Sequence, residues 1–218
     1  MPQDKKVSLV VIRRLPRYYR YLSDLLSQDI RRISSKELSE RMNVTASQIR
    51  QDLNCFGGFG QQGYGYNVEY LHEEISKILG LDKGYRTIII GCGHLGHALA
   101  NHAGFKRRGF KLSGMFDNSE EKVGKKIAGV EIMHISSMES FIAKHPVDIA
   151  ILALPKDGVL EISQRLIACG VKGLWNFSSV DLEVIEKGRV AVENVHLSDS
   201  LMTLAYKIQE REASNEMD

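Results

Sequence analysis

Apolar side chains recur at intervals of three or four through the first 80 residues, a pattern that predicts amphipathic helices. The first predicted helix follows Pro16, and it carries Tyr18, Leu22, Leu25 and Leu26 on one face. Proline suits the first turn of a helix because its missing N–H would have no partner there. The chain therefore opens with a helix that we expect to pack against a core.

Two shorter helices are predicted from their N-terminal signals. Ser34 precedes Glu37, and Thr45 precedes Gln48, by the three residues of a capping box. Asn43 suits the left-handed conformation that a tight turn between the two helices requires. Two short helices joined by so tight a turn cross steeply, which is the arrangement of a helix-turn-helix.

The second helix of this pair lies within "TASQIRQDLNCF" and directs Ile49 and Leu53 toward the core. Its polar side chains are expected to point outward from the start of the helix. Amide and guanidinium groups at that position suit base edges and phosphates in a major groove. We therefore predict DNA contacts from Ser47, Gln48, Arg50 and Gln51.

The following stretch, "FGGFGQQGYGYNVEYL", places five glycines among aromatic residues. This composition is typical of a short hairpin whose strands pass close to another molecule. Behind a helix-turn-helix, such a hairpin is a wing that reaches a minor groove or the DNA backbone. Its predicted DNA-contacting residues are Gly60, Gln61, Gln62 and Tyr64. The alternative for residues 1–80 is a small helical interaction domain with a structural glycine loop.

Beyond a predicted helix that starts after Asn67 and ends at Gly80, the pattern changes. Apolar strands such as "TIIIG", "FKLSGMFD", "DIAILALP" and "KGLWNFS" alternate with amphipathic helices. Continuous apolar strands of this kind indicate a parallel sheet that is covered on both faces. We predict an α/β chain in which a winged helix-turn-helix domain, residues 1–80, precedes a Rossmann-like, doubly wound sheet at residues 85–196.

A glycine-rich loop follows the first of these strands. Gly91 allows a tight turn, Gly93 lets the backbone approach a pyrophosphate, and Gly96 lets helix and strand pack closely. Asp117 ends the next strand, 21 residues beyond Gly96, where a carboxylate can accept hydrogen bonds from a ribose. A Rossmann-like fold for another nucleotide, such as coenzyme A, is the alternative. The predicted ligands of NAD⁺ or NADH are Gly91, Cys92, Gly93, His94, Leu95, Gly96, Asp117, Leu154 and Pro155.

Catalytic chemistry is not evident around this loop. Hydride transfer needs an acid or base beside the nicotinamide and a pocket for a second reactant, and the sequence suggests neither. We expect no catalytic residue, although a small NAD-dependent oxidoreductase with a fused DNA-binding head is the alternative. His94 and His97 form an HxxH pair without a third ligand nearby, so no metal is expected. A redox-active thiolate at Cys92 is a further alternative.

The last segment, residues 197–218, is predicted to form a helix with its own apolar stripe. Leu201, Leu204, Ala205 and Ile208 share one face, and the sheet is complete before this helix begins. A helix with no surface of its own domain left to cover is expected to dock on a second subunit. A homodimer also suits helix-turn-helix proteins, because their two-fold symmetry matches the half-sites of a pseudo-palindromic operator.

Composition changes this picture in two respects. The net charge of the 218-residue chain is +2, yet residues 1–56 hold 11 Lys and Arg against 6 Asp and Glu, whereas the remainder is slightly acidic. A basic N-terminal region favours a polyanionic partner. The three cysteines form no CxxC pair, and no apolar run approaches the ~18 residues of a membrane span, so we expect a cytoplasmic protein without membrane contact.

Taken together, these motifs resemble the Rex family of bacterial repressors that sense the NADH/NAD⁺ ratio. The similarity runs through "IRRLPRYYRYL", "TASQIRQDL", "GYGYNVEYL", "GCGHLGHALANHAGF", "FDNSEEKVGKK", "DIAILALP" and "VKGLWNFS" in order. It implies that the cofactor is sensed rather than turned over. The oxidised form would permit DNA binding by a homodimer with swapped C-terminal helices, and NADH would favour a closed dimer that leaves the operator.

Several positions differ from the pattern of that family. Gln51 stands where the family usually has Lys, and Gln61 and Gln62 stand where the wing usually carries a basic residue. The loss of these cations would weaken the attraction to phosphate and flatten the salt dependence of binding. Leu197 stands where an aromatic residue often lies near the nicotinamide. A paralogue with a weakened NADH response is therefore an alternative within the same family.

A second difference concerns the switch that the resemblance implies. Family members often pair an Arg of the first helix with an Asp of the partner's swapped segment, with a Tyr nearby. By position these are Arg20, His196 and His102, so the acid and the phenol are both replaced by histidine here.

These histidines predict a switch that depends on pH, because an imidazole changes its charge near pH ~6.5. The release of DNA by NADH should differ between pH ~6 and pH ~8, and the double variant His102→Tyr, His196→Asp should remove that dependence. Fluorescence anisotropy of a labelled operator measures both. An identical redox response at the two pH values, in the wild type and in the double variant, would contradict this hypothesis.

Overall fold

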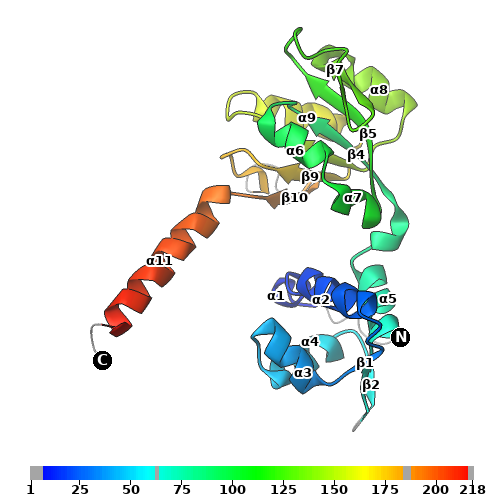
Figure 1. Cartoon of the computed structure of the whole chain (residues 1–218). Coiled ribbons are helices and arrows are strands. Elements are labelled where there is room, and N and C mark those ends of the chain that lie inside the picture. Colours follow the sequence, from blue (N-terminus) through cyan, green and yellow to red (C-terminus); the bar gives the residue numbers. More distant parts are fainter. Residues whose placement is uncertain (1–6, 62–63, 184–187, 216–218) are drawn as a thin grey trace. The chain divides into compact units, whose positions relative to one another are not determined.

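The computed structural model describes residues 7–61, 64–183 and 188–215 (Figure 1). The chain divides into two compact units, Met1–Lys83 and Gly84–Asp218, and each unit has its own hydrophobic core. Within the described ranges, no helix combines the length and the apolar character that crossing a membrane requires.

Unit 1 is largely helical and packs around α2 (Leu15–Ser27) and α5 (Val68–Ile78). Tyr18 and Leu22 of α2 and Leu71 and Ile75 of α5 are fully buried in its core, as the spacing of apolar residues predicted for α2. Its elements are α1 (Leu9–Ile12), α2 (Leu15–Ser27), β1 (Arg32–Ile33), α3 (Ser35–Met42), α4 (Ala46–Asn54), β2 (Gly60–Gln61), β3 (Gly65–Asn67) and α5 (Val68–Ile78).

The helix-turn-helix of α3 and α4 begins with the predicted caps, with one correction. The Ser34 hydroxyl accepts the Glu37 N–H at 3.1 Å, and the Glu37 carboxylate accepts the Ser34 N–H at 2.8 Å, so this capping box is complete. Asn43 ends α3 in the left-handed conformation with φ 51°. Thr45 accepts the Gln48 N–H at 3.1 Å, but the Gln48 side chain turns to another partner, so the second box is only half formed.

The predicted hairpin is present and gains a third strand that the sequence pattern did not indicate. Strands β2 and β3 pair antiparallel, and β1 pairs with the other edge of β3. Gly65 has φ +70°, and a Cβ atom at this position would lie 2.6 Å from the Ile33 carbonyl oxygen of β1. Glycine is therefore required where the hairpin meets this strand. Gln62 lies outside the described residues.

Unit 2 contains the predicted Rossmann-like sheet. Its strands are β4 (Tyr85–Ile90), β5 (Phe110–Asp117), β6 (Lys126–Ile127), β7 (Val130–His134), β8 (Ile149–Leu152), β9 (Gly173–Asn176) and β10 (Ala191–Asn194). They lie in the order β10-β9-β8-β4-β5-β7-β6, and all pairs are parallel except that of β6 with β7. The strand order reverses between β4 and β8, where ligands of such sheets bind.

Helices cover both faces of this sheet, and alternate residues of β4 belong to different cores. Ile88 and Ile90 pack in the cluster that includes residues of α8 (Met138–Lys144) and α9 (Val159–Ala168). Ile89 packs in the cluster that includes Leu99 of α6 (His94–Ala100). In the part of unit 2 that the structure describes, the α-helices with assigned bounds are α6 (His94–Ala100), α7 (Ala103–Arg107), α8 (Met138–Lys144), α9 (Val159–Ala168) and α11 (Leu197–Asn215).

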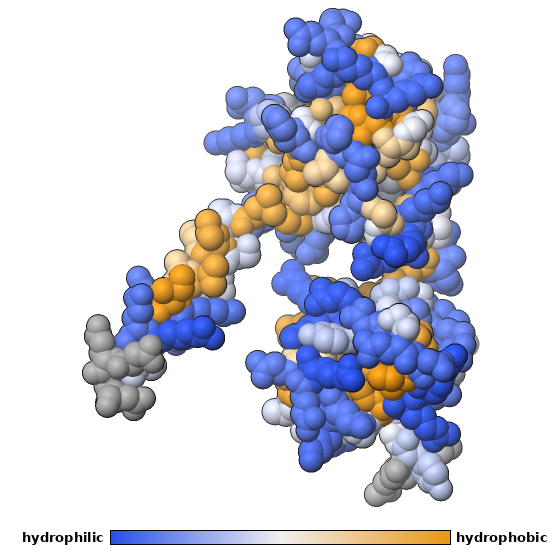
Figure 2. Space-filling model, viewed as in Figure 1, coloured by the Kyte–Doolittle hydropathy of each residue, from blue (hydrophilic) through white to orange (hydrophobic). Residues whose placement is uncertain are grey.

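The last helix, α11, matches the predicted C-terminal helix and begins at Leu197. Its side chains at positions 197–214 are all exposed. Leu201 is 67% exposed and Leu204 is 52% exposed, and Figure 2 shows apolar side chains along much of this helix. Exposed apolar area of this extent is unusual on a monomeric protein and marks an interaction surface.

Candidate functional site

The glycine loop at the carboxyl end of β4 is shaped by two close approaches of the backbone. Gly91 has φ +93°, its N–H donates to the Phe116 carbonyl oxygen at 2.8 Å, and a Cβ atom here would run into the Ala153 carbonyl group. A Cβ atom at Gly96 would run into the Gly91 carbonyl group in the same way. At Gly93, by contrast, a Cβ atom would meet no atom within 4 Å. Gly91 and Gly96 thus serve the fold, whereas the space at Gly93 is open to a ligand.

Asp117 ties this loop to the end of β5. Its Oδ2 atom accepts the Cys92 N–H at 2.7 Å and the Lys122 ammonium at 2.9 Å, and its Oδ1 atom accepts the Ser119 N–H at 2.9 Å. Burial alone would raise the pKa of this carboxyl group. The hydrogen bonds from Lys122, Ser119 and Cys92 outweigh burial and lower the pKa. Asp117 is therefore an anion near neutral pH, and it fixes the loop as well as facing the cavity.

A cavity of about 660 Å³ opens above the carboxyl ends of the strands. The predicted residues that line it are Gly91, Gly93, His94, Leu95, Asp117, Leu154 and Pro155. Cys92 and Gly96, which were also predicted to contact the cofactor, are buried and do not line it. The lining residues that sequence reasoning missed include Asn118, Ile135, Arg165 and Phe177. The sequence could have indicated Asn118, since this residue directly follows Asp117 at the end of β5.

Arg165 of α9 contributes a fixed cation to the cavity wall. Its Nε atom donates to Glu139 at 2.6 Å, and its Nη1 atom lies 3.8 Å from Glu161. The hydrogen bond to Glu139 also lowers the pKa of that carboxyl group. Arg165 and Lys122 are thus cations at this wall that are each paired with a carboxylate.

The cavity fits a dinucleotide. The open space at Gly93 admits a pyrophosphate to the loop, and the N–H groups of the first turn of α6 have no partner within the helix. Asp117 faces the same cavity with a carboxylate that can accept a ribose hydroxyl.

The redox alternative for Cys92 is contradicted. The thiol is only 6% exposed, and burial together with the nearby Asp117 carboxylate raises its pKa to about 11. Such a thiol stays protonated near neutral pH and is a poor nucleophile. Among the described residues, no group of three His, Cys, Asp or Glu side chains is arranged to hold a metal ion.

The second candidate surface is the exposed side of α4. Ser47, Arg50 and Gln51 are exposed as predicted, and Arg50 donates to the Ser35 hydroxyl of α3 at 3.0 Å. The prediction that Gln48 simply points outward is wrong. Gln48 is half-buried, and its Nε2 atom donates to Asp52 at 2.8 Å.

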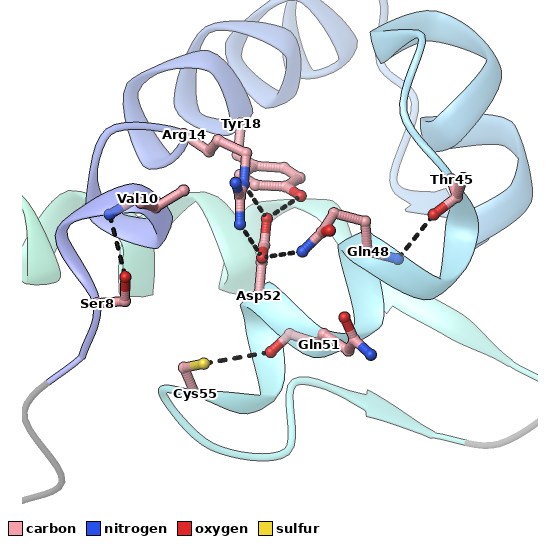
Figure 3. A network of polar contacts seen from close by, with 9 residues as sticks. All are labelled: Ser8, Val10, Arg14, Tyr18, Thr45, Gln48, Gln51, Asp52 and Cys55. Atoms are coloured by element: carbon pink, nitrogen blue, oxygen red, sulfur yellow. Dashed lines mark hydrogen bonds and ion pairs between the residues drawn. The ribbon is translucent and has the colours of Figure 1, made fainter.

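Asp52 is the centre of a buried polar network that joins α4 to α2 (Figure 3). It is 1% exposed and accepts two hydrogen bonds from Arg14, both at 2.6 Å, and one from the Tyr18 hydroxyl at 2.9 Å. Burial alone would raise the pKa of Asp52, but the hydrogen bonds from Arg14, Gln48 and Tyr18 lower it. The sequence did contain a signal for this network, because the acidic Asp52 lies on the same face of α4 as the buried Ile49.

The wing presents an exposed aromatic side chain. Tyr64 is 70% exposed, and the guanidinium carbon of Arg32 lies 6.0 Å from the centre of its ring. Gly60 is exposed, and a Cβ atom there would lie 2.9 Å from the Tyr66 ring. Gln61 lies in β2.

The predicted switch residues belong to both units. Arg20 is exposed on α2, where its guanidinium carbon lies 5.8 Å from the centre of the Tyr21 ring. His102 lies at the start of α7, and its ring stacks on that of Phe105 with 4.4 Å between the ring centres. His196 is half-buried just before α11. Their action as one switch stays a prediction.

Replacement by alanine is expected to have different effects at Gly93 and at Gly96. Gly93→Ala should leave the free energy of unfolding within about 1 kcal/mol of wild type, because its Cβ atom meets open space. It should nevertheless weaken NADH binding by about 10-fold or more, since the methyl group occupies the ligand's approach. Gly96→Ala should lower both stability and affinity. Urea unfolding and calorimetric titration measure the two quantities, and a Gly93→Ala variant that binds NADH normally would contradict this assignment.

The Asp52 network predicts a pH-dependent contribution to stability. The carboxyl pKa of Asp52 in the folded chain lies below its ordinary value of 3.8, so the stabilisation is complete above that value and is lost as the pH falls through the folded pKa. Arg14→Met should lower the free energy of unfolding by about 3 kcal/mol near neutral pH, because it leaves a buried charge unpaired. Urea unfolding should show this difference shrinking in acid, while exposed Arg13→Met changes little. A difference that is constant with pH would refute the assignment.

Comparisons with known proteins match both parts of the chain. A family model described as "Putative DNA-binding protein N-terminus" matches residues 6–54, and a model described as "CoA binding domain" matches residues 82–180. The first match covers the helix-turn-helix, and the second covers most of the Rossmann-like sheet.

Full-length relatives are more specific. The chain is 58% identical over 212 residues to the redox-sensing transcriptional repressor Rex of Thermoanaerobacter pseudethanolicus, which covers 97% of this chain and 94% of that protein. It is 55% identical over 207 residues to the repressor Rex of Clostridioides difficile, with 95% and 98% covered. These relatives are named as regulators rather than enzymes, as the sequence predicted, and they argue against the oxidoreductase alternative.

Two solved structures share the fold over almost the whole chain. One is the repressor RSP in complex with NAD⁺ and operator DNA, with a TM-score of 0.88, 56% identity and coverage of 97% of this chain and 96% of that chain. The other is RSP in complex with NADH, with a TM-score of 0.88, 52% identity and coverage of 98% and 100%. The chain therefore belongs to the Rex family of redox-sensing transcriptional repressors.

Proposed function

We propose that this protein is a repressor that binds operator DNA in the apo or NAD⁺ form and leaves the DNA when NADH binds. The observation that carries this proposal is the presence, in one chain, of an open dinucleotide cavity and a helix-turn-helix with a wing. The relative RSP has been crystallised with NAD⁺ and operator DNA and also with NADH. The proposed site of action is the cytoplasm.

The cofactor is proposed to lie in the cavity of unit 2. The pyrophosphate would approach the loop at Gly93, and the Asp117 carboxylate would accept a ribose hydroxyl. When bound, the cofactor would supply a nicotinamide whose charge and shape differ between its two redox states. The proposed contacts from this chain are Gly91, Gly93, His94, Leu95, Asp117, Leu154 and Pro155. Cys92 and Gly96 are proposed to shape the loop behind these contacts.

The DNA is proposed to lie against unit 1. The start of α4 would enter a major groove, and the wing would contact the minor groove or the backbone. The proposed contacts are Ser47, Gln48, Arg50 and Gln51 on α4 and Gly60, Gln61, Gln62 and Tyr64 on the wing. Because α4 and the wing carry glutamines where relatives usually have cations, phosphate contacts should release fewer counterions, and binding should depend less steeply on salt.

The functional form is proposed to be a homodimer in which α11 of each chain packs against the other chain. The exposed apolar residues of α11 need a partner surface, and a two-fold dimer provides two such surfaces at once. Two copies of α4 would then read the two half-sites of a pseudo-palindromic operator.

The proposed switch follows from linkage. NADH can release DNA only if it binds the state that is unable to bind DNA more tightly than the state that binds it. DNA must then weaken NADH binding by the same factor. Arg20, His102 and His196 are the proposed switch residues. A Rex paralogue with a weakened response is the second candidate, supported by the two histidines, and it predicts nearly equal effects of NAD⁺ and NADH.

The test is the binding of a labelled palindromic duplex, selected from random DNA, without cofactor, with NAD⁺ and with NADH. Anisotropy should show tight binding in the first two states and release in the third, and DNA should lower the measured NADH affinity by the same factor. Equal binding in all three states would leave a DNA-binding dimer that does not sense the cofactor. Failure to select any duplex would overturn the proposed function.

A further inference from the structure

The side-chain amide of Gln48 has a fixed direction. Its Nε2 atom donates to Oδ1 of Asp52 at 2.8 Å (Figure 3). An ionised carboxylate only accepts hydrogen bonds, so the nitrogen of the amide and not its oxygen must face Asp52. The amide oxygen Oε1 is consequently directed away from the network, and it has no hydrogen-bond partner among the described residues.

Asp52 can impose this direction because it is itself immobile. Oδ1 also accepts from Nη2 of Arg14, and Oδ2 accepts from Nε of Arg14 and from the Tyr18 hydroxyl. The bidentate pairing with Arg14 sets the plane of the carboxylate, and Asp52 is 1% exposed. Rotation of this carboxylate would break several charge-assisted hydrogen bonds at once.

The backbone of Gln48 is held as well. Its N–H donates to the Thr45 hydroxyl at 3.1 Å, which places Gln48 in the first turn of α4. Its neighbours Ser47 and Gln51 are exposed, whereas Gln48 is half-buried. The residue therefore joins the exposed side of α4 to the buried network beneath it.

We propose that Asp52 is a positioning residue that holds the Gln48 amide with its oxygen toward the DNA, so that Gln48 reads an exocyclic amino group in the major groove. The candidates are N4 of cytosine and N6 of adenine, which are the amino donors that bases present there. A glutamine free to rotate its amide could satisfy either a donor or an acceptor, and it would discriminate less between bases. This inference rests on the proposed function, because it assumes that α4 enters the major groove.

The first experiment removes amino groups from the selected operator one at a time, with purine in place of adenine and 2-pyrimidinone in place of cytosine. Wild type should lose affinity by about 5-fold to 10-fold at one position of each half-site, as expected for one hydrogen bond. Gln48→Ala should bind less tightly and show no loss at that position. A Gln48→Ala variant with the full wild-type profile would overturn the inference.

The second experiment tests Asp52 itself. Asp52→Asn should lose the sensitivity at the position that Gln48→Ala loses, while it still binds unrelated DNA. Ile75→Ala is the matched control, because Ile75 is fully buried in the same core and has no part in the network. That variant should keep the wild-type profile even if it is less stable. An Asp52→Asn variant that keeps the profile would overturn the positioning role.

If Asp52→Asn does not fold, a measurement on the wild-type protein still tests the orientation of Gln48. Hydrogen exchange of the Gln48 side-chain amide, followed by NMR, should be slower than that of the exposed Gln51. Equal exchange at the two residues would overturn the inference. A wild-type protein that binds no duplex would overturn the proposed function, whereas specific binding with no dependence on Gln48 would overturn only this inference.

Discussion

A carboxylate can be buried in a protein only if hydrogen-bond donors replace the water that it loses, and both units of this chain are organised around that constraint. Asp52 in unit 1 accepts four hydrogen bonds at its two oxygens, and Asp117 in unit 2 accepts three. In both cases the donors come from different elements, so satisfying the charge fixes those elements relative to one another.

Each of these buried carboxylates lies directly beneath a candidate ligand surface. Asp52 holds the helix proposed to enter DNA, and Asp117 holds the loop proposed to carry the pyrophosphate. Hydrophobic packing is non-directional, whereas a carboxylate that accepts several hydrogen bonds constrains the position and orientation of each donor. Hydrogen bonds to a carboxylate therefore suit a surface that must bind a ligand with little reorganisation. The side chains of such a surface have already lost their conformational entropy during folding, so binding does not have to order them.

Much of the fold was predictable because its signals are local. The cap at Ser34, the left-handed Asn43 and the close approach at Gly96 each depend on a few neighbouring residues. Strand β1 was missed because two residues carry no periodicity, and only pairing with β3 makes them a strand. The direction of Gln48 was missed for a related reason, since Arg14 lies 38 residues from Asp52 in the sequence. Arg165 was likewise brought to the cavity wall by the packing of α9.

Two titratable groups at the glycine loop are each held in one protonation state, which does not suit them to proton transfer. A general acid or base must exchange its proton near neutral pH. Asp117 holds the loop and has a lowered pKa that keeps it ionised, whereas Cys92 of the loop has a raised pKa that keeps it protonated. Arg165 is held by ion pairs to Glu139 and Glu161. A redox-dependent repressor requires instead that the free energy of cofactor binding favours one conformation over another.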